Sequence, residues 1–256
     1  MKIAVIGAGN MGGAIVKGLL CGKSVSPENI WVANPSRPKL DALQSIDSRI
    51  TITTDNQEAV SAADWVVLAV KPWLIEAVIK SLTFRSEQVV VSIAAGVTFD
   101  QLTSYIGGTH TLFRVMPNTA ISEQASMTLI SSYNATREQE AQIVLLFAEL
   151  GRAMIVPEAK MAAATILASC GIAYVLKYIH AATEAGVEMG IAPHDAMIMV
   201  AKSVEGAAKL ILNNDTHPAV EIDKVTTPGG ITIKGLNTLE HAGFSSAIIQ
   251  AMKSCL

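Results

Sequence analysis

A group of glycines near the amino terminus has the spacing of a loop that binds the phosphates of a nucleotide. Gly7, Gly9 and Gly12 form the pattern Gly-x-Gly-x-x-Gly between the apolar run 3–6 and a stretch of helical pattern. Glycines in this position let the backbone approach a pyrophosphate, which is bound by backbone N–H groups and by the positive end of the helix dipole. The sequence therefore predicts a dinucleotide site at the first strand-to-helix turn.

The end of the second predicted strand indicates which dinucleotide is bound. An NAD site has Asp or Glu there, about 20 residues after the glycines, to bind the ribose 2′-hydroxyl. This chain has Asn34 instead, followed by Ser36 and Arg37. No carboxylate repels a 2′-phosphate, and the hydroxyl and the guanidinium can both donate hydrogen bonds to one. We therefore expect NADPH, without excluding NADH; the alternative is that Arg37 is only a solvated residue at a helix start.

A second anion site is predicted much further along the chain. The segment 227–232, Thr-Pro-Gly-Gly-Ile-Thr, joins two helical stretches. Backbone N–H groups ahead of a helix, with threonine hydroxyls beside them, form a pocket for a small carboxylate. The segment therefore predicts the site of a small carboxylate substrate.

The elements that must position these residues change in kind near residue 157. Residues 1–157 alternate apolar β-type runs with helical patterns, which is typical of a doubly wound, Rossmann-type α/β domain with parallel strands. Residues 158–256 show helical spacing only, interrupted by prolines and glycines into four or five helices. The predicted strands are 3–6, 30–33, 50–53, 65–70, 89–93, 111–115, 127–130 and 154–156.

Composition and charge exclude several classes of protein. Half of the 256 residues are hydrophobic and the net charge is -3, which argues against disorder and against a nucleic-acid partner. Cys21, Cys170 and Cys255 have no metal-binding spacing and indicate a reducing compartment, so we expect a cytoplasmic protein. The uncharged run 161–176 is shorter than the roughly 20 residues of a membrane span. Its burial predicts a homodimer without a membrane partner, which can also be the unit of a ring of dimers.

Five motifs together resemble the pyrroline-5-carboxylate reductase family over the full length of the chain. They are Gly-Ala-Gly-Asn-Met-Gly at 7–12, Ala-Val-Lys-Pro at 69–72, Arg-Val-Met-Pro-Asn at 114–118, Val-Pro-Glu at 156–158, and the 227–232 segment. The resemblance implies an NAD(P)H-dependent reduction of 1-pyrroline-5-carboxylate to L-proline, the last step of proline biosynthesis. It also implies a Rossmann domain at 1–157 and a helical substrate-binding and dimerisation domain at 158–256.

The resemblance also implies which residues bind each ligand. Together with Arg37, the expected cofactor-binding residues are Ile6, Gly7, Ala8, Gly9, Asn10, Met11, Asn34, Ser36, Asn56, Ala69, Val70, Lys71, Pro72, Ala95 and Pro117. The expected substrate-binding residues are Glu158, Lys224, Thr227, Gly230, Ile231 and Thr232, where Lys224 replaces a neutral residue and adds attraction for a carboxylate. Thr232 is the expected catalytic residue, because its hydroxyl can orient the imine nitrogen. No metal site is expected.

The chain departs from the family on the long helix that follows residue 157. Ala162 stands where the family has Asp, and Ala-Ser-Cys-Gly-Ile at 168–172 replaces Ser-Gly-Ser-Gly-Pro. These changes predict a straighter and less polar helix. Two other functions stay open: a β-hydroxyacid dehydrogenase, whose catalytic lysine motif Lys177 does not fit in spacing, and a regulator that binds NADPH without turnover.

Overall fold

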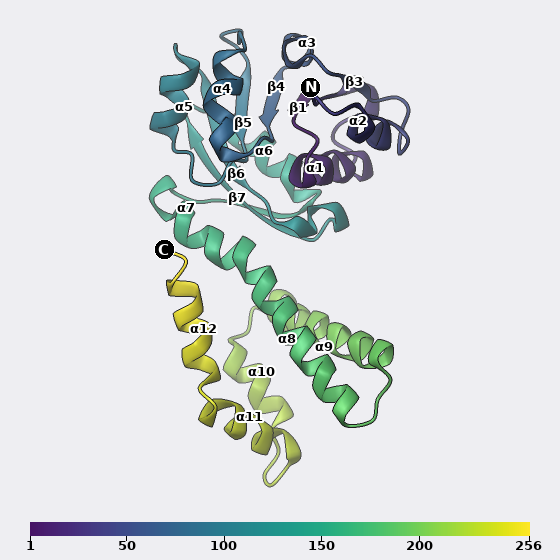
Figure 1. Ribbon diagram of the computed structural model, residues 1–256. Helices are drawn as coiled ribbons and strands as arrows, with labels where there is room; N and C mark the ends of the chain where they lie inside the picture. The colour runs from purple at the N-terminus through teal and green to yellow at the C-terminus, as the bar shows by residue number, and fades with distance from the viewer. The chain divides into compact units, whose positions relative to one another are not determined.

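The computed structural model describes all residues, 1–256, and divides them into two compact units, Met1–Ser169 and Cys170–Leu256 (Figure 1). This division lies after Ser169, whereas the sequence predicts a domain boundary after residue 157. The difference arises because the first two turns of the long helix pack on the sheet of unit 1. Each unit is described by itself below.

Unit 1 contains one eight-stranded sheet with the strand order β3-β2-β1-β4-β5-β6-β7-β8. The strands are β1 (Ile3–Ile6), β2 (Ile30–Ala33), β3 (Thr51–Thr53), β4 (Trp65–Leu68), β5 (Val89–Ser92), β6 (Thr111–Met116), β7 (Ser126–Tyr133) and β8 (Gly151–Ile155). All eight predicted strands are present. Most neighbouring strands are parallel, as the apolar runs indicated, but β7 is antiparallel to β6. The connection 117–125 holds only a short 3-10 helix, η3 (Thr119–Glu123), and is too short for a parallel crossover.

Both faces of the sheet are covered by helices, because alternate strand residues are apolar on each face. Ile3 and Val5 of β1 pack in one cluster, while Ala4 and Ile6 pack in the other. The first cluster includes residues of α1 (Asn10–Cys21), α2 (Arg37–Gln44) and α6 (Arg137–Ala148). The second includes residues of α3 (Asn56–Ala62), α4 (Ile75–Lys80) and α5 (Phe99–Ile106). Short 3-10 helices, η1 (Pro27–Asn29) and η2 (Pro72–Leu74), precede β2 and α4.

The last part of unit 1 is α7 (Glu158–Thr165) and the turn that follows it. Residues Ile166–Cys170 form a π-helical turn rather than regular α-helix, so the predicted straight helix is wrong here. The Asn118 side-chain amide donates to the Ala168 carbonyl at 2.9 Å, and the Ser169 hydroxyl donates to the Pro117 carbonyl at 3.1 Å. A π turn is stable where its carbonyls find partners outside the helix. The chain therefore keeps polar contacts in a segment that we expected to be less polar.

Unit 2 consists of helices only, as predicted. They are α8 (Gly171–Glu188), α9 (Pro193–Asn214), α10 (Pro218–Val225), α11 (Ile231–His241) and α12 (Phe244–Lys253). Helices α8 and α9 form a hairpin, in which Gly186 lies against Ala196. Many large apolar side chains of this unit are exposed, including Leu176, Met199 and Leu212. The run 161–176 is not fully covered within the single chain, as the prediction of a partner chain implies, and these side chains require another surface to cover them.

One helix, Glu158–Glu188, is long and apolar enough to cross a membrane when length and composition alone are considered. That criterion is weak for a single helix, because an apolar helix of a soluble core or subunit interface also satisfies it.

Candidate cofactor and substrate sites

The glycine-rich turn lies where the carboxyl ends of three neighbouring strands meet. The Gly7 N–H donates to the Ala33 carbonyl at the end of β2, and the Ala69 N–H donates to the Ile6 carbonyl at the end of β1, both at 2.8 Å. A Cβ atom on Gly12 would lie 1.9 Å from the Gly7 carbonyl oxygen, so no other residue fits this turn. The first N–H groups of α1 are thereby left open at the sheet edge, as a pyrophosphate site requires.

Asn34 holds the glycine-rich turn to the loop after β2. Its side chain is buried; the oxygen accepts the Ala8 N–H at 3.0 Å, and the amide donates to the Ser36 carbonyl at 3.2 Å. Because both ends of the amide are used within the chain, Asn34 positions the two loops that surround the expected dinucleotide. The sequence predicted a direct cofactor contact at this residue, and the structure adds this positioning role.

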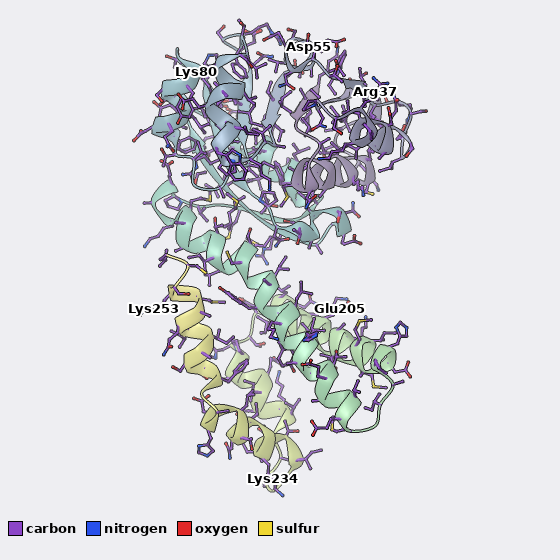
Figure 2. The ribbon with its side chains drawn as sticks, viewed as in Figure 1. Arg37, Asp55, Lys80, Glu205, Lys234 and Lys253 are labelled. Carbon is purple, nitrogen blue, oxygen red and sulfur yellow. The ribbon has the colours of Figure 1, made fainter.

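The two basic residues of α2, Arg37 and Lys39, have different surroundings. Arg37, labelled beside α2 in Figure 2, pairs with Asp41 at 3.0 Å, and both side chains are more than half exposed. Lys39 instead lines a cavity of about 680 Å³ together with Gly9 and Asn10 of the glycine-rich turn. Lys39 is not among the cofactor-binding residues expected from the sequence. Its place two positions after Arg37, in the first turn of α2, is the signal that could have identified it.

The cavity contains part of the predicted cofactor site and several residues that were not predicted. Besides residues 8–11, it is lined by Gly13, Ala14, Lys17, Lys39, Ala42, Leu43, Ile46, Thr119 and Ser122. The other expected cofactor residues follow the carboxyl ends of their strands: Asn56 after β3, residues 69–72 after β4, Ala95 after β5 and Pro117 after β6. They therefore lie along one edge of the sheet, where ligands bind in doubly wound folds.

Glu158 has a structural partner in unit 1. Its Oε1 atom lies 2.6 Å from a guanidinium nitrogen of Arg114 and accepts the Phe99 N–H at 2.9 Å. Arg114 on β6 is buried, so the Glu158 carboxylate supplies the counter-charge that a buried cation needs. The Glu158 carboxylate thus connects α7 to β6 and α5. A substrate that binds Glu158, as predicted, would have to do so while these bonds are kept.

In unit 2 the 227–232 segment forms a tight turn ahead of α11. The Gly230 N–H donates to the Thr227 carbonyl at 2.9 Å, so this N–H group is used inside the turn. A Cβ atom on Gly230 would lie 2.5 Å from the Thr227 hydroxyl oxygen. A side chain at 230 would therefore fit only if the Thr227 side chain moved.

The start of α11 presents the groups that a carboxylate needs. Ile231 is 88% exposed and Thr232 is also exposed at the amino-terminal end of this helix. Thr226 and Thr238 donate their hydroxyls to carbonyls of their own helices, whereas no such bond engages Thr232. The N–H groups of the first turn of α11 and the Thr232 hydroxyl are thus available to a ligand.

Lys224 is paired within α10, which changes its expected role. Its ammonium group donates to Glu221 at 2.8 Å, and the Thr216 hydroxyl donates to the same oxygen at 2.6 Å. These hydrogen bonds, with Lys224 as the larger cause, lower the pKa of Glu221 below its ordinary value. The Lys224 ammonium group therefore has a carboxylate partner on its own helix before any substrate binds.

Metal chemistry finds no support in the arrangement of side chains. No group of three or more His, Cys, Asp and Glu side chains lies together. His180 and Glu184 form an exposed pair on α8, with 3.6 Å between a ring nitrogen and a carboxylate oxygen.

Two family models match separate parts of the chain. Residues 158–256 match the family described as pyrroline-5-carboxylate reductase dimerisation, and residues 2–96 match the family described as NADP oxidoreductase coenzyme F420-dependent.

Full-length similarity extends across distant organisms. The chain is 37% identical over 259 residues to pyrroline-5-carboxylate reductase of Escherichia coli, covering 100% of this chain and 96% of that protein. It is 34% identical to pyrroline-5-carboxylate reductase 1 of Dictyostelium discoideum over 98% of this chain, which spans only 48% of that longer protein. A crystal structure of Plasmodium falciparum pyrroline carboxylate reductase with NADP bound superposes with a TM-score of 0.90, at 25% identity, over 100% of this chain and 95% of that one.

Proposed function

The chain belongs to the pyrroline-5-carboxylate reductase family, and from this premise we propose that it reduces 1-pyrroline-5-carboxylate to L-proline with NADPH. One observation carries the proposal: two helices, α1 and α11, each begin with a glycine-containing turn that leaves N–H groups open to an anion. The first turn suits a pyrophosphate and the second suits a small carboxylate.

The residues of unit 1 fit a dinucleotide. The close approach of Gly12 to Gly7 makes the cradle that a Cβ atom would fill, and Asn34 holds that cradle to the loop after β2. We place the 2′-phosphate between the Ser36 hydroxyl and the Lys39 ammonium group. Arg37 adds charge from the outer side of α2 while it remains paired with Asp41. The absence of a carboxylate at position 34 favours NADPH over NADH.

The residues of unit 2 fit the substrate. The N–H groups at the start of α11 bind the carboxylate, and the Thr232 hydroxyl hydrogen-bonds the ring nitrogen. When bound, NADPH supplies the hydride that reduces the imine carbon, while the ring nitrogen takes one proton. We assign Thr232 an orienting role, because an alcohol is a poor acid near neutral pH. For hydride transfer, the nicotinamide ring of NADPH must lie against the imine carbon of the substrate.

The exposed apolar side chains of unit 2 support a homodimer as the active assembly. Large apolar surfaces on a folded chain mark interfaces with other proteins, and this unit corresponds to the dimerisation family. A ring of such dimers remains part of the proposal. All three cysteines are unpaired, which suits a reducing compartment such as the cytoplasm.

The decisive experiment follows the loss of NADPH absorbance in the presence of 1-pyrroline-5-carboxylate, with proline identified as the product. Oxidation of NADPH that depends on the imine supports the proposal. Turnover of a 3-hydroxy acid with NADP⁺ instead would identify a β-hydroxyacid dehydrogenase. Tight NADPH binding without turnover of either substrate would identify a regulator.

A further inference from the structure

Trp73 is an exposed aromatic residue at the edge of the sheet that carries the cofactor site. Its side chain is 76% exposed, whereas Trp65 is 5% exposed in the core. Trp73 lies in η2, directly after the Lys71-Pro72 pair that follows β4. No predicted role involves this residue, and the packing of unit 1 does not use it. An aromatic side chain of this size in water is unfavourable unless another surface covers it.

The strand order places Trp73 on the same edge of the sheet as the loops expected to surround the adenosine half of a dinucleotide. Strand β4 lies next to β1, whose carboxyl end leads into the glycine-rich turn, and β2 lies on the other side of β1. Helices α3 and α4 pack in the same apolar cluster and therefore on the same face of the sheet. Helix α3 and η2 both begin at the carboxyl edge, because each follows its strand. The start of α3, the loop after β2 and Trp73 thus lie around one part of that edge.

The local contacts prepare one face of the indole for stacking. The Lys71 ammonium group lies 5.9 Å from the centroid of the Trp73 ring, a cation–π distance, and so covers one side of the ring. Pro72 restricts the backbone immediately before Trp73 and limits the freedom of the side chain's position. The high exposure of Trp73 leaves the other side of the ring open to a flat group.

We infer that Trp73 is the platform on which the adenine ring of NADPH stacks; this inference rests on the proposed function. With the pyrophosphate at α1 and the 2′-phosphate at Ser36, the adenosine half lies over the carboxyl ends of β1 and β2, next to η2. Adenine is a flat group with an apolar face, and stacking on an aromatic side chain suits it. The Lys71 charge beside the ring also suits a ligand that carries phosphates.

The test measures the affinity of the wild type and of Trp73 variants for adenosine 2′,5′-bisphosphate. This ligand has the adenine and the 2′-phosphate but no nicotinamide. Trp73→Ala should weaken its binding about 5- to 100-fold, the range expected for loss of one base–aromatic stack. Trp73→Phe keeps an aromatic ring, so its Kd for the bisphosphate should stay within about threefold of the wild-type value. Tryptophan fluorescence should respond to the ligand in the wild type and lose most of that response in Trp73→Phe. Leu145→Ala, which truncates another exposed apolar side chain, on α6, is the matched control and should bind normally.

A kinetic comparison separates stacking from a general effect on the fold. With reduced nicotinamide mononucleotide, which lacks adenine, Trp73→Ala should keep the wild-type kcat/KM. With NADPH, its kcat/KM should fall by the same factor as its affinity for the bisphosphate. Equal binding of the bisphosphate by wild type and Trp73→Ala overturns the inference, and so do equal kinetic losses with both reductants. A shift of Trp73→Ala from dimer to monomer with unchanged binding also overturns it, by showing that a second copy covers the indole. If the wild type binds the bisphosphate through Trp73 but reduces no imine, the proposed function fails while the stacking platform stands.

Discussion

Lys39→Ala should reduce NADPH affinity more than Arg37→Ala, although Arg37 is the residue that the sequence pattern favours. Lys39 shares a cavity with Gly9 and Asn10 and has no acidic partner, whereas Arg37 is already paired with Asp41. To bind a 2′-phosphate, Arg37 must give up Asp41 or place the phosphate beside that carboxylate. The two substitutions therefore remove the same formal charge from the same helix but different interactions with the cofactor.

The magnitudes follow from these environments. A hydrogen bond to a charged group contributes about 1.5–3 kcal/mol, so Lys39→Ala should raise the Kd for NADPH roughly 10- to 150-fold. An exposed ion pair contributes about 0–1 kcal/mol, and the exchange of one partner for another contributes no more, so Arg37→Ala should raise that Kd less than about fivefold. Neither change should alter NADH affinity by more than about twofold, because NADH has no 2′-phosphate to lose a contact.

Calorimetric titration of each variant with NADPH, NADH, adenosine 2′,5′-bisphosphate and ADP measures all of these differences directly. The ratio of the first two affinities reports the 2′-phosphate contact, and the bisphosphate isolates it from the nicotinamide. A raised salt concentration should reduce the difference between wild type and Lys39→Ala, because screening weakens the charged contact. If Lys39→Ala weakens NADPH and NADH equally, the lysine contacts another part of the cofactor and the assignment of the 2′-phosphate is wrong.

Three further outcomes test the substrate site and the contacts that support it. Thr232→Ala should lower kcat about 10- to 100-fold with little change in NADPH binding, because one hydrogen bond to the ring nitrogen is lost; wild-type turnover in a steady-state assay would make Thr232 only a helix residue. Glu158→Gln leaves the buried Arg114 without a counter-charge and should lower the unfolding free energy by roughly 1–2 kcal/mol, or Tm by about 2–8 °C; an unchanged calorimetric Tm would show that the pair contributes nothing. Glu221 has a folded pKa below its ordinary 4.5, so its pairing with Lys224 stabilises the protein above that pH and is lost as the pH falls through the folded pKa. Denaturant titrations across that range should show the wild type approaching Glu221→Gln in stability as the pH falls, and a pH-independent difference would contradict this.

Several features were predictable because they depend on short stretches of chain. The eight strands follow from apolar runs of three to six residues, and their positions agree with the structure to within a few residues. The start of α6 at Thr136 was predictable from the capping-box pair with Gln139, which the structure contains. The glycine pattern indicated a tight strand-to-helix turn, and the structure adds the close approach of Gly12 to Gly7. The family resemblance likewise rests on motifs that are local in sequence.

The antiparallel strand and the π turn were not predictable in the same way. A β-type run reads the same in either direction, and the direction of β7 depends on how the short connection after β6 turns back. The π turn at Ile166–Cys170 replaces a segment where the substitutions alone favoured regular helix. Its carbonyl at Ala168 is satisfied by Asn118, a residue on another element.

The sequence by itself determined the chemical types at the two proposed anion sites, the order of strands and helices along the chain, and the family. Only the tertiary structure decided which polar groups remain available to a ligand. Asn34 is bonded to Ala8 across 26 positions of chain, and Glu158 to Arg114 across 44 and to Phe99 across 59. Residue type and spacing do not report such partners, because a hydrogen bond forms between whichever donor and acceptor the packed elements bring within about 3 Å. For the same reason, the sequence pointed to Arg37, while the folded chain pairs Arg37 with Asp41 and leaves Lys39 in the cavity beside the glycine-rich turn.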